Sequence, residues 1–239
     1  MPAASLGGRA RPLGKRMLNL RLLQLGDSAL PVGGYTHSWG LETAISRERV
    51  YDAASLESWT TDWLKRCVGP FDGVVVAAVC RAVTDGCWED VARANELVTA
   101  SLAPPTLRSA SREMGEQLAG LAGTWDWSRG KVDGLAQPET RWNYCVVFGV
   151  VAAAGGATPR LALTAYLNQT TLGMIAAGVR GIPLGHTHAQ QILAYLHDTI
   201  AELTEYYADQ PLDTAGSGCP YYEVLCDEQS RLYTRLFRS

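Results

Sequence analysis

Residues 141–178 read RWNYCVVFGVVAAAGGATPRLALTAYLNQTTLGMIAAG, and they decide the fold class of this chain. Two long apolar segments stand on either side of Gly155-Gly156, a pair that ends the first segment as a helix breaker. Thr158 suits the N-cap of the second segment, and Pro159 suits its first turn. No alternating strand pattern persists here. The sequence therefore predicts two consecutive apolar helices, residues 141–154 and 158–178.

Helical spacing of apolar residues continues through most of the chain. Ser55 is a candidate N-cap for a helix that Gly69-Pro70 would close. Further helices are expected over residues 74–85, 87–100, 107–122 and 188–207. This pattern predicts an all-α fold with about eight to ten helices in a single globular multi-helix domain. We expect that domain to span residues 17–210, with a basic, disordered N-terminal tail (1–16) and an extended C-terminal docking tail (211–239).

The composition excludes several classes of protein. Hydrophobic residues make up 47% of the chain, enough for a sizeable core, and the net charge of −3 argues against a nucleic-acid partner. No apolar run in the sequence reaches the roughly 18 residues of a membrane span, and no secretory signal is recognisable, so we expect a cytoplasmic protein without a membrane partner. None of the six cysteines forms a C-x-x-C pair, and a disulfide framework is not expected.

The most informative loop reads GGYTHSWGLETA from Gly33 to Ala44. Its glycines indicate a shaped connection between two helices, and its polar groups exceed what a core connection needs. Tyr35, His37 and Glu42 are therefore candidate partner-binding residues. A catalytic triad drawn from His37, Ser38 and Glu42 is not supported, because no nucleophile elbow surrounds Ser38. Ser38 is expected to cap a helix that begins at Trp39.

Motifs for other chemistry are missing from the sequence. No phosphate-binding loop is present, so the chain is not expected to hydrolyse nucleotides alone. His188 and His197 lie nine positions apart, on opposite faces of a helix, and neither they nor His186 have the spacing of metal ligands. We therefore predict no catalytic residues, no metal-binding residues and no cofactor of its own.

The chain ends on YTRLFRS, which alternates apolar and cationic side chains. Aromatic residues and arginine are the usual anchors of protein interfaces. This composition favours a docking tail over a frayed terminus. The candidate partner-binding residues in it are Tyr233, Arg235, Leu236, Phe237 and Arg238.

The chain resembles the UreF family of urease accessory proteins from about Leu20 to Ser239. The likeness rests on LQLGDSALPVGGYTHSWGLE (23–42), SREMGEQL (111–118), YCVVFG (144–149) with PLG (183–185) and QQIL (190–193), and RLFRS (235–239). The family often has His where Asn143 stands, Gln where His186 stands, and Met-Arg-His-Glu where this chain has Asp227–Ser230. These departures do not alter the predicted fold, and they fall on details of partner contact.

The resemblance implies a function that composition cannot supply. Proteins of this family are all-helical homodimers that bind a second accessory protein, UreD (also called UreH), and recruit the GTPase UreG. Their assembly delivers nickel to apo-urease, so the complex handles the metal, with a proposed role in regulating the GTPase. Among the candidate residues, the resemblance points to Tyr35 and Arg235 as those that hold the GTPase complex. Two alternatives remain open: a metallochaperone that binds nickel itself, and a helical-bundle enzyme acting on a small molecule.

Overall fold

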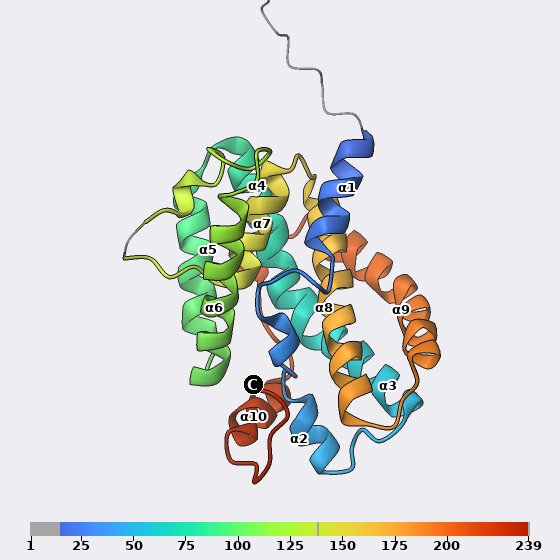
Figure 1. The fold of residues 1–239 in the computed structure, drawn as a ribbon. Coiled ribbons are helices and arrows are strands. Elements are labelled where there is room, and N and C mark those ends of the chain that lie inside the picture. The colour runs from blue at the N-terminus through green and yellow to red at the C-terminus, as the bar shows by residue number, and fades with distance from the viewer. Residues whose placement is uncertain (1–14, 138, 239) are drawn as a thin grey trace, which may run out of the picture.

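The computed structural model describes residues 15–137 and 139–238, and most of the predicted N-terminal tail lies outside them. The described residues form helices and no strand, which confirms the predicted all-α domain (Figure 1). The elements are α1 (Lys15–Leu25), η1 (Gly34–Thr36), α2 (Leu41–Ser46), α3 (Ala53–Trp63), η2 (Leu64–Gly73), α4 (Val74–Asp85), α5 (Trp88–Ser101), α6 (Pro105–Ala122), η3 (Asp133–Leu135), α7 (Tyr144–Ala154), α8 (Pro159–Gly181), α9 (His186–Tyr207), η4 (Leu212–Thr214) and α10 (Pro220–Gln229).

The core is built around α7, the apolar helix that the sequence indicates most strongly. Ten of its eleven residues are buried, and α4, α6 and α8 pack against it. Helix α9 covers the outer side of α8, and α1 lies at the end of the molecule opposite α2 and α10 (Figure 1). Thr158 caps α8, accepting the main-chain N–H of Leu161, and Pro159 is its first residue, as predicted.

Gly69-Pro70 does not end a helix, so that expectation is wrong. The chain stays helical from Ala53 to Asp85, because η2 is a π-helix that accommodates Pro70. A proline inside a helix removes one N–H donor and displaces the preceding turn. Two carbonyl groups of η2 instead accept hydrogen bonds from a distant loop: Gly218 N–H to Arg66 O at 2.9 Å and Gly216 N–H to Pro70 O at 3.1 Å.

This continuous helix is long and apolar enough to span a membrane by length and composition alone. However, 56% of its most apolar 18-residue window is buried inside the fold. Core helices of soluble proteins pass the same test, because burial in a protein interior also selects apolar residues. Packing in the core therefore accounts for its composition.

Two predicted helix caps are corrected by the structure. Asp52, not Ser55, is the N-cap of α3; Ser55 occupies the third helical position and completes a capping box with Asp52. Ser38 is not an N-cap either, since α2 begins at Leu41 and its N-cap is Gly40, with φ of +84°. Glycine adopts this left-handed conformation without steric cost. A Cβ there would also lie 3.2 Å from both Leu225 Cβ and Tyr222 O of α10.

The predicted extended tail (211–239) contains a helix. Pro220 lies at the start of α10, where its fixed φ favours a helix, and the residues after Gln229 lack regular structure. Helix α1 likewise begins at Lys15, inside the predicted N-terminal tail. The domain boundary at residue 210 stays a prediction. Helix α10, which lies beyond that boundary, packs closely on α2 of the main domain.

Candidate functional site

The C-terminal segment, residues 230–238, folds back onto the loop that precedes α2. Arg238 N–H donates to Thr36 O at 2.8 Å, and Arg238 also pairs with Glu113 of α6 at 3.0 Å. Beneath the segment, the Thr43 hydroxyl donates to Leu225 O at 2.9 Å, which joins α2 to α10. Both regions that the sequence marks as candidate partner sites therefore form one site in space.

Glu42 is the polar centre of this site. Its side chain is buried, with 8% of the residue exposed. One carboxylate oxygen, Oε1, accepts the N–H of Leu236 at 2.5 Å, and Oε2 accepts the N–H of Phe237 at 3.2 Å. Oε2 also accepts Nε2–H of Gln229 at 3.0 Å. The carboxylate thus holds the C-terminal segment by its main chain.

An arginine stack fixes the side chain of Phe237. The guanidinium carbon of Arg180, in the last turn of α8, lies 3.6 Å from the centroid of the Tyr35 ring and 4.4 Å from that of Phe237. A cation placed against two ring faces is attracted by both quadrupoles. Phe237 is only 4% exposed, whereas Tyr35 is 64% exposed. The stack therefore leaves Tyr35 at the surface and buries Phe237.

His37 is a buried, neutral member of the site. Burial and, second, the positive charge of Arg238 lower the pKa of His37 to about 4, and the negative charge of Glu113 opposes them. The imidazole packs on Trp39 with ring centroids 5.3 Å apart. Its environment disfavours the charged form, so at neutral pH His37 is uncharged.

The predicted partner-binding residues fall into two groups. Tyr35, Tyr233, Arg235, Leu236 and Arg238 are exposed, and Arg235 makes no hydrogen bond or ion pair within the described part of the chain. His37, Glu42 and Phe237 are buried inside this chain. Sequence reasoning missed Arg180 and Gln229, because no local pattern links α8 or the end of α10 to the loop.

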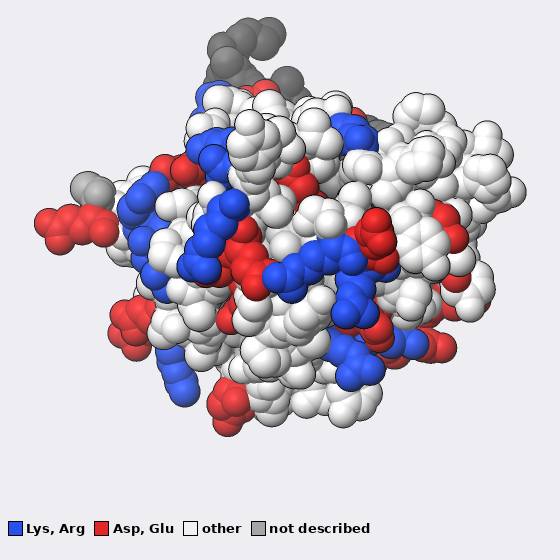
Figure 2. Space-filling model, turned by 90° about the horizontal axis from the view of Figure 1, so that it is seen from below, with Lys and Arg blue, Asp and Glu red and all other residues white. Residues whose placement is uncertain are grey.

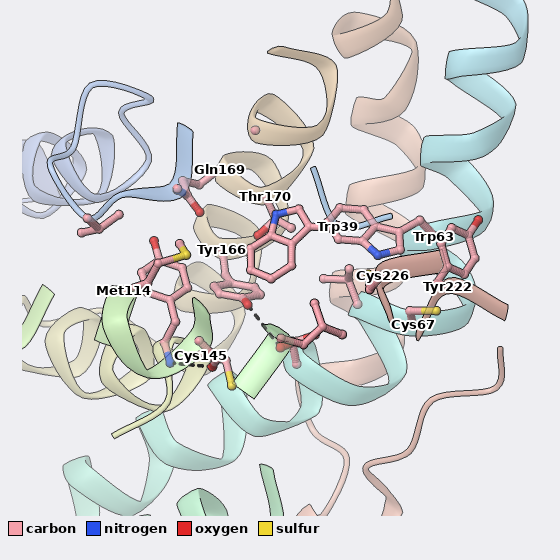
Figure 3. A pocket seen from close by; sticks show the side chains of 18 of the residues that line it. Trp39, Trp63, Cys67, Met114, Cys145, Tyr166, Gln169, Thr170, Tyr222 and Cys226 are labelled. Atoms are coloured by element: carbon pink, nitrogen blue, oxygen red, sulfur yellow. Dashed lines mark hydrogen bonds between the residues drawn. The ribbon is translucent and has the colours of Figure 1, made fainter. Parts of the chain in front are cut away.

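Behind the site lies a cavity of about 160 Å³. Tyr35 and Arg180 line part of it, and Trp39, Cys145 and Tyr166 surround its interior (Figure 3). The backbone of Trp39 has φ of +53°, an uncommon conformation for a bulky residue. Trp39 lies in the loop that carries the site and also lines the cavity, so this loop forms part of the cavity wall.

Asp72, in the π-helix η2, lines the same cavity. Desolvation raises the pKa of Asp72 to about 6, although the thiol of Cys145 and the hydroxyl of Tyr166 stabilise the carboxylate. The Tyr166 hydroxyl donates to Asp72 Oδ1 at 3.3 Å. Asp72 is a partly buried acid that the sequence analysis did not single out. Among the described residues, no group of three or more His, Cys, Asp or Glu side chains could hold a metal ion.

Comparison with known proteins identifies the family. The UreF family model matches residues 50–197, more than half of the chain. The chain belongs to the UreF family.

Three UreF proteins illustrate how far the likeness extends. The urease accessory protein UreF of Dechloromonas aromatica is 30% identical over 220 residues, which cover 92% of this chain and 96% of that protein. That of a Bradyrhizobium species is 35% identical, covering 92% and 91%. That of an Azoarcus species is 33% identical, covering 95% and 98%. The family name places this chain among the accessory proteins of urease maturation.

One position where the chain departs from the UreF pattern lies in the core. Asn143 is fully buried, and its N–H and its side-chain amide both donate to Asn95 Oδ1, at 2.8 and 2.9 Å. Its amide also donates to Thr99 Oγ1 at 2.8 Å, which joins α5 to the start of α7. Asn143 therefore has a structural role in this UreF chain.

The other departures lie on the surface or in the site. His186 is exposed at the start of α9. Asp227 pairs with Arg231 at 2.9 Å and Glu228 with Arg47 at 2.7 Å, while Gln229 is buried against Glu42. The run 227–230, where this chain differs from the expected family pattern, therefore includes one residue of the candidate site.

Proposed function

We propose that this chain is a non-catalytic recruitment factor in urease maturation. It binds the accessory protein UreD (UreH), recruits the GTPase UreG, and supports nickel insertion into apo-urease, possessing no cofactor of its own. It acts in the cytoplasm as a homodimer, and the complex as a whole handles nickel. Regulation of the GTPase is a further part of the proposal.

The observation that carries the proposal is the anchored C-terminal segment. Tyr233, Arg235 and Leu236 are exposed on a segment whose main chain is fixed by a buried carboxylate. Exposed aromatic and arginine side chains on a fixed backbone supply interface anchors at little entropic cost. A free terminus would have to be ordered on binding, which would weaken the association.

The surrounding face supports a polar, specific contact. Figure 2 views the molecule from the side of α2 and α10, and basic and acidic side chains alternate across that face. Mixed charges favour one partner orientation over general attraction to a polyanion. Arg235 offers a fixed fork of donors that suits a carboxylate of the partner.

Recruitment is tested by capture of UreD (UreH) and UreG on tagged wild type, Tyr35→Ala and Arg235→Ala. We expect each variant to weaken capture of UreG by about 1–3 kcal/mol, because these side chains are exposed anchors. Arg231→Ala is the matched control, since it removes an exposed arginine that pairs within the chain with Asp227. Equal capture and equal urease activation by all four folded proteins would refute the assignment.

The isolated chain is expected to be catalytically silent. The site contains no phosphate loop, and its one histidine is buried and uncharged at neutral pH. Purified protein should hydrolyse neither urea nor GTP above the blank in a coupled ammonia or phosphate assay. Turnover that depends on Asp72 or another residue of the cavity would instead favour a small-molecule enzyme.

A further inference from the structure

We propose that Glu42 is a positioning residue that sets the place and register of the C-terminal segment for recruitment. This inference rests on the proposed function, and it gives Glu42 a different role from a partner contact. The carboxylate of Glu42 is buried, and the hydrogen bonds that it accepts come from groups of the same chain. It is therefore poorly placed to contact a partner directly.

The carboxylate recognises two consecutive main-chain N–H groups. Leu236 donates to Oε1 and Phe237 to Oε2, 194 and 195 positions away along the chain. Hydrogen bonds to an ionised acceptor are about twice as strong as neutral ones. Because main-chain N–H groups are common to all residues except proline, this contact fixes the position of the segment whichever residue types stand at 236 and 237.

The same contact fixes which side chains face the protein. With the two N–H groups held, Phe237 is buried at 4% exposure against Arg180 and Leu236 is 71% exposed. A shift of one residue would bury a different side chain beside Arg180 and expose the phenyl ring. The register therefore decides whether Arg235 and Leu236 are available to a partner.

A polar relay orients the third donor to Glu42. The Ser38 hydroxyl donates to Gln229 Oε1 at 2.9 Å, which leaves Gln229 Nε2–H to donate to Glu42 Oε2 at 3.0 Å. Ser38 and Gln229 are 0% and 1% exposed. A buried polar network of this kind holds one arrangement, because any other leaves a group unpaired. The relay connects the loop, the end of α10 and the C-terminal segment.

The first test is Glu42→Gln, which keeps the size of the side chain but places an NH₂ group against N–H donors. We expect hydrogen exchange at the Leu236 and Phe237 amides to rise about tenfold or more, as the loss of a charge-assisted hydrogen bond predicts. Capture of UreG should fall in parallel. Arg47→Ala is the matched control, because it removes only the surface ion pair between α2 and α10.

A second pair of variants keeps the test valid if Glu42→Gln fails to fold. Leu236→Pro removes the main-chain donor to Oε1, whereas Leu236→Ala keeps that donor and loses the same exposed side chain. We expect faster exchange at Phe237 and weaker capture in Leu236→Pro than in Leu236→Ala. Leu236 is itself 71% exposed, so neither substitution removes a buried side chain.

The outcomes separate the two proposals. Unchanged exchange in both Glu42→Gln and Leu236→Pro would show that Glu42 does not hold the segment. Faster exchange in these variants with undiminished capture of UreG would show that recruitment does not depend on the position of the segment, which also overturns the inference. If wild type captures neither UreD (UreH) nor UreG, the proposed recruitment function is wrong. The role of Glu42 in recruitment is then wrong as well, even if hydrogen exchange shows that Glu42 holds the segment.

Discussion

Gly115→Ala is expected to destabilise the fold by about 3 kcal/mol or more, at or above the usual range for overpacking a core. A Cβ at Gly115 would lie 2.1 Å from the carbonyl oxygen of Trp142, a backbone atom that no side-chain rotation can move. On the same helix, Ser111 accepts the N–H of Tyr144 at 3.2 Å, so α6 and the start of α7 cannot separate without losing that bond.

Gly120→Ala provides the control within the same helix. A Cβ there has no heavy atom within 4 Å outside its local helix backbone, and alanine in a helix is favoured over glycine by about 0.5–1 kcal/mol. Urea unfolding should therefore show opposite signs for the two variants. Similar stabilities for Gly115→Ala and Gly120→Ala would mean that α6 does not approach the chain at Trp142 this closely.

Asp72→Asn is expected to stabilise the chain at pH 8, by up to about 3 kcal/mol, since one pKa unit corresponds to about 1.4 kcal/mol. Burial raises the pKa of Asp72 from 3.8 to about 6. The folded chain therefore binds this proton more tightly than the unfolded chain. The resulting stability is fully present below about pH 3.8 and is lost as the pH rises through about 6.

The difference between wild type and Asp72→Asn isolates this group. His37 has a lowered pKa and loses its contribution as the pH falls from 6.5 towards about 4, but it titrates in both proteins and cancels. Urea unfolding at pH 8, 6 and 4 should show the advantage of the variant shrinking as the pH falls. A difference independent of pH would contradict a raised pKa of Asp72 in the folded chain.

The sequence by itself determined the all-α class of this protein and its central apolar helices. The apolar run of α7 and the Thr158-Pro159 start of α8 are local signals, because burial on every face and N-capping depend on residues within one or two turns. The loop motif and the terminal RLFRS were both predicted to bind partners. Their residues lie together in the structure, although whether they bind a partner stays a prediction.

Only the tertiary structure decided how those signals combine. Gly69-Pro70 lies inside a helix, because the π-helix carbonyls find donors at Gly216 and Gly218. Phe237 has the composition of a docking anchor, yet it is buried against Arg180 of α8. Glu42 binds N–H groups 194 and 195 positions away, and main-chain donors leave no mark in the side-chain pattern. Such pairings depend on which surfaces meet after the helices pack, so no local period or spacing can specify them.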